Sequence, residues 1–158
     1  MESREVAEWS NVIFHHLTEA ALRYDAVPVK YVGDGFLCFF SGPAHAHRAI
    51  KAARRAKRIV QNPAVIIALN CGDIYLGTIG HPDYSSRDIC GPSVNLAFLI
   101  LDHVAERCPS GIGFTKEVVH RLDEPVPLRR HAGIYVERLQ SEIELFEPDT
   151  KEERGTPV

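Results

Sequence analysis

The stretch Lys30-Tyr31-Val32-Gly33-Asp34-Gly35-Phe36-Leu37-Cys38-Phe39-Phe40 decides how the chain is expected to fold. The apolar run at 36–40 predicts a buried strand, and the run at 27–32 predicts another strand before it. Gly33-Asp34-Gly35 is typical of a tight turn, so the two strands are expected to form a β-hairpin. Asp34 then lies at an exposed tip, where a carboxylate suits a hard cation such as Mg²⁺. An aspartate that only caps its own turn is the plainer alternative.

Helices and further strands follow on both sides of this hairpin. Apolar residues at helical spacing predict helices over 2–24, 43–60, 92–107 and 116–122. Strands are expected at 64–70, 74–79, 87–90, 112–115, 127–138 and 142–147, with a polar loop at 80–86. Because helices alternate with both single strands and hairpins, the pattern predicts an α+β fold, a mixed sheet with helices on one face.

Length, composition and charge exclude several classes of protein. The chain has 158 residues, 45% of them hydrophobic and 25% charged, which predicts one folded domain at 1–148 and a charged tail at 149–158. The net charge of −3 disfavours a dedicated DNA or RNA binder. No apolar run is long enough to span a membrane, and the charged start does not resemble a secretion signal. We therefore expect a cytoplasmic protein.

The cysteines and histidines give no metal-binding motif. Cys38, Cys71, Cys90 and Cys108 lie far apart and form no CxxC pair, so they are interpreted as small hydrophobic residues in a reducing compartment. The eight histidines include no HExxH pattern. Surface or core histidines are therefore the preferred interpretation, with a metal site as the alternative.

Two further segments carry residues that chemistry would use. Residues 69–80 contain Gly72, Gly77 and Gly80, and glycines in strands mark bulges, tight packing or a close approach of the backbone to a ligand. In residues 84–97 a polar residue ends the strand expected at 87–90, and a glycine turn at Gly91 leads into an apolar helix, with Asn95 in the first turn of that helix. Its amide either caps the helix locally or faces a ligand.

In this order and at these separations, the three segments resemble the catalytic domain of the class III nucleotide cyclases, the adenylate and guanylate cyclases. The family pattern K-x-x-x-G-D-G before an apolar strand looks like residues 30–40, and its glycine-rich strand pair looks like 69–80. Its signature D-hydrophobic-x-G-x-x-V-N-x-A looks like residues 88–97. The resemblance covers roughly residues 8–148, and it implies a ferredoxin-like α/β sandwich.

The resemblance also implies an activity and a set of site residues. Such cyclases convert ATP or another nucleoside triphosphate into the 3′,5′-cyclic monophosphate and pyrophosphate, with two Mg²⁺ or Mn²⁺ ions at the interface of two paired chains. By this resemblance Asp34 is expected to bind metal, and Lys30 and Asp88 to read the base. Asn95 is expected to orient the ribose. Lysine can donate to adenine N1 and a carboxylate can accept from the adenine amine, so the pair indicates ATP rather than GTP.

Two departures from the family pattern lower the expected activity. No segment before the first expected helix matches the family's first strand, which carries the other metal-binding aspartate and leads into the phosphate-binding turn. The family's arginine position is Leu99, which cannot donate a hydrogen bond to a phosphate. We therefore expect a weak or inactive cyclase-like domain that works as a homodimer or pairs with another cyclase domain. Alternatives are a complete cyclase represented by a fragment or a mis-assigned start, and a ferredoxin-like scaffold that binds RNA or protein.

Overall fold

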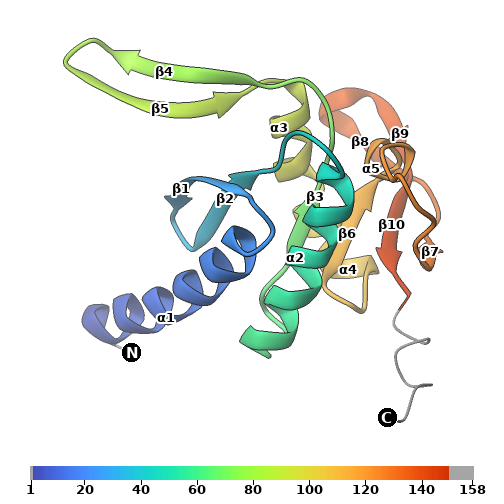
Figure 1. The fold of residues 1–158 in the computed structure, drawn as a ribbon, viewed down its shortest axis with the longest axis horizontal. Helices are drawn as coiled ribbons and strands as arrows, with labels where there is room; N and C mark the ends of the chain where they lie inside the picture. Colours follow the sequence, from blue (N-terminus) through green and yellow to red (C-terminus); the bar gives the residue numbers. More distant parts are fainter. Residues whose placement is uncertain (1, 150–158) are drawn as a thin grey trace. The chain divides into compact units, whose positions relative to one another are not determined.

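A computed structural model describes residues 2–149, and it divides into two compact units that we treat separately (Figure 1). The first unit contains residues up to 62 together with 75–89, and the second contains 63–74 and the residues from 90 onward. The tail expected at 149–158 lies outside the described residues except for Asp149. Both units mix helices and strands, which confirms the α+β prediction.

The first unit contains two helices and two hairpins. Its elements are α1 (Ser3–Leu22), β1 (Val27–Val32), β2 (Gly35–Phe39), α2 (His45–Val60), β4 (Tyr75–His81) and β5 (Tyr84–Cys90), whose last residue, Cys90, belongs to the second unit. The buried residues of these helices are mostly small: Ala20 and Ala21 on α1, and Ala46 and Ala53 beside the larger Ile50 on α2. Tyr31 of β1 stacks on Phe14 of α1 with ring centroids 4.5 Å apart, which ties the first hairpin to its helix.

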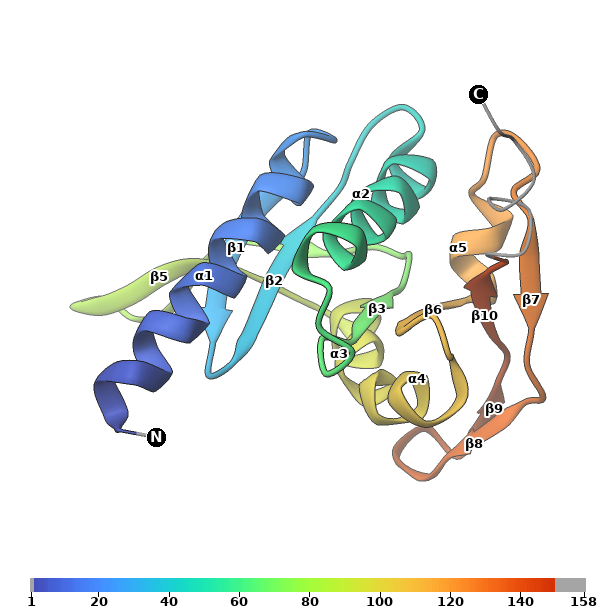
Figure 2. The same cartoon turned by 90° about the horizontal axis from the view of Figure 1, so that it is seen from below.

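The second unit is built on a four-stranded mixed sheet. Its elements are β3 (Ile67–Leu69), α3 (Pro92–Leu99), α4 (Leu101–Arg107), β6 (Ile112–Thr115), α5 (Lys116–His120), β7 (Leu128–Arg130), β8 (Ile134–Val136), a 3₁₀ turn (Glu137–Leu139), β9 (Ser141–Ile143) and β10 (Leu145–Pro148). The sheet order is β3-β6-β10-β7, with β3 parallel to β6 and the other pairs antiparallel. Figure 2 shows the same elements from below.

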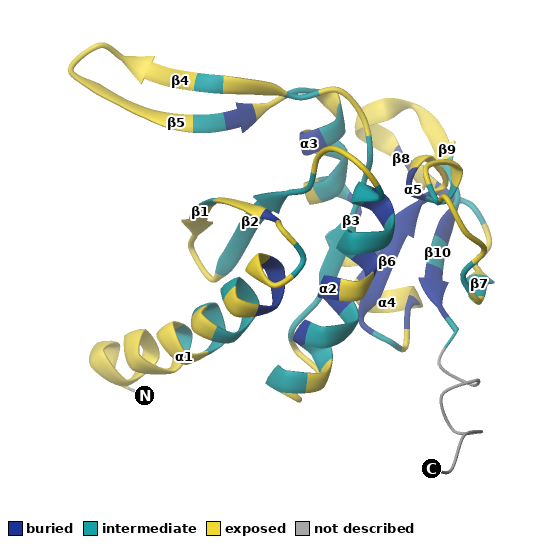
Figure 3. Ribbon diagram, viewed as in Figure 1, coloured by how far each residue is buried: buried dark blue, intermediate teal, exposed yellow. Residues whose placement is uncertain are grey.

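A hydrophobic cluster joins the helices and strands of the second unit. Ile100 and Val104 from the helices pack with Cys108, Ile134 and Leu145, and these residues are at most 4% exposed. Figure 3 shows β6 and β10 as the buried strands of this unit. The buried strand expected at 112–115 is therefore confirmed as β6.

Three sequence expectations need correction. Residues 80–86 do not form a loop: β4 continues to His81, the chain turns at Pro82 and Asp83, and β5 begins at Tyr84. The hairpin is exposed along most of its length, so it lacks the alternation of apolar and polar residues that reveals a strand.

The helix expected over 92–107 is divided into α3 and α4 at Ile100, whose φ of −88° and ψ of −8° lie at the edge of the right-handed helical region. Backbone hydrogen bonds from Ile100 N to Leu96 O and from Val104 N to Ile100 O still span the junction. The strands expected at 127–138 and 142–147 are each divided into two shorter ones. None of the helices in residues 2–149 combines the length and the hydropathy needed to cross a membrane.

Candidate nucleotide-binding site

Asp34 lies where the sequence predicts it, at the tip of the β1–β2 hairpin. Val32 pairs with Gly35, so Gly33 and Asp34 make the turn between the strands. Gly33 has a φ of 58°, a left-handed conformation that glycine adopts without steric penalty. Asp34 is exposed. Its carboxylate is therefore accessible to an ion or a ligand from solvent.

Lys30 and Asp88 are brought together by the fold of the first unit. Lys30 lies on β1 and Asp88 on β5, 58 residues apart in the sequence, and Lys30 Nζ donates to Asp88 Oδ2 in an ion pair. The register of β1 shifts between Pro28 and Lys30, at a proline that has no N–H to offer the ladder. The lysine side chain is 41% exposed and the aspartate 16%. Both groups are thus within reach of a ligand.

The electrostatics keep Asp88 charged. The hydrogen bond from Lys30 is the main cause that lowers the pKa of Asp88 below its usual value of 3.8, and the backbone N–H of Ile89, 2.8 Å from Oδ1, lowers it further. Each carboxylate oxygen still has acceptor capacity, and the lysine ammonium has two further N–H donors. The pair can therefore accept one hydrogen bond from a ligand and donate another while it stays intact.

Asn95 lies in the second unit, on the first turn of α3. Its backbone N–H donates to Gly91 O at 3.1 Å, and the residue is exposed. Gly91 has a φ of 141°, and a Cβ at this position would be 3.3 Å from Asp73 O. The turn that begins α3 therefore requires glycine, as the sequence pattern suggests.

A polar network that sequence reasoning missed holds the start of α3 against the sheet. Asn70 Nδ2 donates to Ser93 O at 2.9 Å, and Thr115 Oγ1 donates to Asn70 Oδ1 at 2.6 Å. Ser93 Oγ donates to Asp73 O at 2.6 Å. The one sign of this network in the sequence is Asn70, a polar residue at the end of an apolar strand. This network fixes the position of the turn that carries Asn95.

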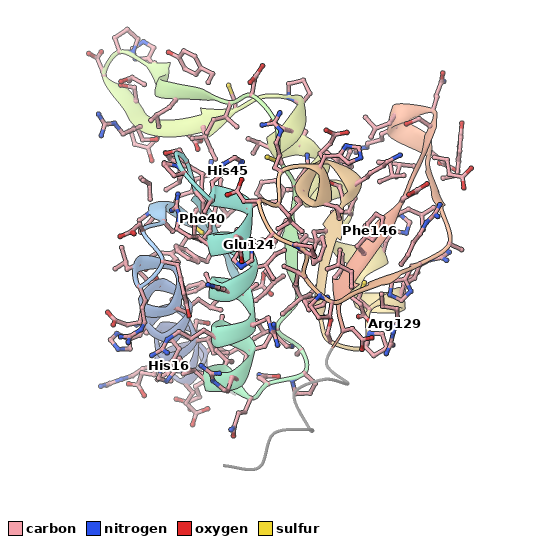
Figure 4. The ribbon with its side chains drawn as sticks, turned by 45° about the vertical axis from the view of Figure 1, so that its right-hand side comes forward. His16, Phe40, His45, Glu124, Arg129 and Phe146 are labelled. Atoms are coloured by element: carbon pink, nitrogen blue, oxygen red, sulfur yellow. The ribbon has the colours of Figure 1, made fainter. Side chains whose placement is uncertain are left out.

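Leu99, at the family's arginine position, has a packing role in this structure. Its side chain is partly buried and contacts the hydrophobic cluster of the second unit. Figure 4 shows the side chains of both units, with His16 and Phe40 labelled in the first and Arg129 and Phe146 in the second. The structure thus pairs Lys30 with Asp88, places Asp34 on the same hairpin as Lys30, and places Asn95 in the other unit.

Solved structures of nucleotide cyclases share this fold. The chain superposes on a bacterial light-regulated adenylyl cyclase with a TM-score of 0.79 and 17% identity, covering 94% of this chain and 46% of that one. For the adenylyl cyclase CyaB from P. aeruginosa the TM-score is 0.71 and the identity 17%, covering 96% of this chain and 85% of that one. The guanylate cyclase domain of RhGC from Catenaria anguillulae, in complex with GTP, superposes with a TM-score of 0.72 and 14% identity. That match covers 92% of this chain and 84% of the other.

The chain therefore has the fold of the adenylyl and guanylyl cyclase catalytic domains, which confirms at the level of fold the resemblance drawn from the motifs. It spans about half the length of the light-regulated cyclase. No family model matches the sequence, and no curated protein matches it.

Proposed function

We propose that this chain is a class III cyclase-like domain that binds ATP, with Lys30 and Asp88 as the residues that read the adenine base. The observation that carries the proposal is the ion pair between these two side chains, which come from strands far apart in the sequence. Adenine presents an acceptor at N1 beside the N6 amine, which is a donor. The lysine would donate to N1 and the aspartate would accept from the amine. Guanine presents a donor at N1 and an acceptor at O6, so the same pair would face mismatched groups.

We also propose that Asp34 binds the Mg²⁺ or Mn²⁺ ion that accompanies the triphosphate. Mg²⁺ is commonly held by one or two carboxylates together with substrate phosphates, and Asp34 offers one exposed carboxylate. A metal ion in such a site neutralises the phosphates and activates the attacking hydroxyl. Asn95, on the exposed first turn of α3, would orient the ribose by hydrogen bonds from its amide.

We expect this chain to be a poor cyclase by itself and to act as one half of a pair. Leu99 packs against the core and offers no donor to a phosphate, and loss of one charge-stabilising donor typically costs on the order of 10²–10³ in rate. One of the structures with this fold, a rhodopsin-guanylyl cyclase core with converted specificity, is in complex with ATPαS. That complex supports nucleotide binding as the function to test first.

Isothermal titration calorimetry with Mg²⁺-ATP tests the proposal. We expect the unmodified chain to bind ATP, and Lys30→Ala or Asp88→Ala to weaken binding by about 5–150-fold, the cost of leaving one hydrogen-bonding group of the base unpaired. The partly exposed ion pair contributes little to folding because solvent screens it, so both variants are expected to fold. Asp34→Asn is expected to weaken binding with Mg²⁺ and to leave metal-free binding unchanged.

Lys51→Ala is the matched control, because Lys51 is an exposed lysine on α2 of the same unit. It is expected to bind ATP as the unmodified chain does. Absence of ATP binding at millimolar concentration, or an equal loss in Lys51→Ala and Lys30→Ala, would contradict the proposal. Those results would favour the alternative of a ferredoxin-like scaffold.

A further inference from the structure

Three side chains in the second unit bring a sulfur, a nitrogen and an oxygen donor to one buried point. Cys108 follows the last turn of α4, His131 follows β7, and Glu147 lies on β10. Cys108 Sγ, a ring nitrogen of His131 and a carboxylate oxygen of Glu147 lie within 4.8 Å of one another. Cys108 is 4% exposed and Glu147 2%. We call these three residues the buried triad.

The histidine of the buried triad lacks the hydrogen-bond partner that a buried polar side chain normally has. His131 Nε2 is shielded from solvent and has no hydrogen-bond partner. Glu147 Oε1 lies 3.6 Å from this nitrogen, which is too long for a hydrogen bond. Buried polar atoms normally have a partner, and a buried ring nitrogen that faces a thiol and a carboxylate is typical of a metal ligand.

Neighbouring side chains hold the carboxylate of Glu147 in a fixed orientation. Ser110 donates to Glu147 Oε2 from its backbone N–H at 3.2 Å and from its hydroxyl at 2.9 Å, and Arg129 Nη1 lies 3.2 Å from Oε1. Such outer partners commonly orient a carboxylate that binds a metal.

We propose that the buried triad binds one Zn²⁺ ion, which fastens the end of α4 to β10 and to the segment after β7. A mixed sulfur, nitrogen and oxygen donor set fits zinc, whereas Mg²⁺ and Ca²⁺ prefer oxygen ligands alone. Zinc bonds of about 2.0–2.3 Å place neighbouring donor atoms about 3.3–3.8 Å apart. The donors therefore need to close by only about 1 Å, which side-chain rotation can supply. A water molecule would complete the tetrahedron.

Binding would release the thiol proton of Cys108 to solvent, because the thiolate is the zinc ligand. Burial, followed by the charge of Glu147, raises the pKa of Cys108 to about 11 when no metal is present.

The test is a titration of the chelator-stripped, reduced full chain with Co²⁺, a spectroscopic substitute for Zn²⁺. We expect one equivalent to produce tetrahedral visible absorption and a thiolate-to-cobalt charge-transfer band, and Zn²⁺ to displace it. Cys108→Ser is expected to remove the charge-transfer band, and His131→Gln to lower the affinity at least tenfold. Zinc at about 100 times its Kd is expected to raise the Tm of the unmodified chain by about 5–10 °C.

Two control variants separate the buried triad from other groups. Cys90→Ser removes an exposed thiol and Asp34→Asn removes the carboxylate assigned to the nucleotide metal, and both are expected to keep the charge-transfer band. No charge-transfer band in the unmodified chain, a band that survives Cys108→Ser, or a band lost in Cys90→Ser would overturn the proposal. Should Cys108→Ser fail to fold by circular dichroism, His131→Gln decides: unchanged cobalt affinity in that variant overturns the proposal.

Discussion

Asp88 accepts two hydrogen bonds from the protein, and one of them comes from a lysine that lies far away in the sequence. The resemblance to the cyclases implied that Lys30 and Asp88 act as a pair, and in the structure their side chains form an ion pair. Their role in reading adenine remains a prediction. The distinction matters because a contact between side chains fixes their geometry, while their role depends on which ligand they meet.

The pKa of Asp88 gives a direct measure of this contact. Carboxyl NMR titration should place it below 3.8, and Lys30→Met should move it back toward 3.8 by removal of the main stabilising hydrogen bond. Because the folded pKa is depressed, the stability that the pair supplies is present above pH 3.8 and is lost as the pH falls from there through the folded pKa. Lys51→Met should leave the titration unchanged, whereas an unshifted Asp88 in the unmodified chain would show that the pair does not form in solution.

The residues missed from the sequence share one property, which is that their partners are distant. Asn70 bonds to Ser93 and Thr115 across separate elements, and the buried triad joins three segments without any short motif. Spacing rules identify ligands that lie on one turn or one helix. They cannot find donors that only the tertiary fold brings together.

At the scale of elements, the sequence predicts the existence of β1, β2 and β6 well because each contains apolar residues next to a glycine. The strand expected to be buried at 36–40 is only half-buried along β2. The β4–β5 hairpin was misjudged as a loop between two shorter strands. Its strands are mostly exposed on both faces, so backbone pairing rather than burial defines them. The division of the 92–107 helix at Ile100 was also missed, since apolar residues continue through it.

The packing of α4 on β6 depends on Gly113, because glycine has no side chain. A Cβ at Gly113 would lie 2.4 Å from Val104 Cγ2, far inside van der Waals contact, and both residues are buried. Gly113→Ala should therefore lower the free energy of unfolding by about 1–3 kcal/mol, as overpacking of a core does. Urea denaturation measures the change.

Val104→Ala provides the matched test, because it removes the methyl groups that the new Cβ would meet. Gly113→Ala should cost clearly less in the Val104→Ala background than in the unmodified chain, a coupling that a double-mutant cycle reports. Equal costs in the two backgrounds would show that the strain arises elsewhere.

For the whole molecule, the first unit leaves several large apolar side chains exposed. Trp9 and Val12 on α1 are 50% and 57% exposed, and Tyr84 at the start of β5 is 92% exposed. We expect the chain to self-associate at micromolar concentration in light scattering after size exclusion, and the double variant Trp9→Ser/Val12→Ser to shift the equilibrium toward monomer. Arg4→Ser on the same helix should have no such effect. A monomer at every concentration of the unmodified chain would contradict the expectation.

The base preference of the bound nucleotide tests the central claim most directly. With Mg²⁺ present, the unmodified chain should bind ATP at least about tenfold more tightly than GTP, because GTP leaves the groups of Lys30 and Asp88 mismatched. The double variant Lys30→Glu/Asp88→Ser offers an acceptor to guanine N1 and a donor to O6, so it should reverse that preference. Calorimetric titration of both proteins with both nucleotides gives the two ratios. An ATP-to-GTP ratio that is the same in the unmodified chain and in the double variant would contradict the account.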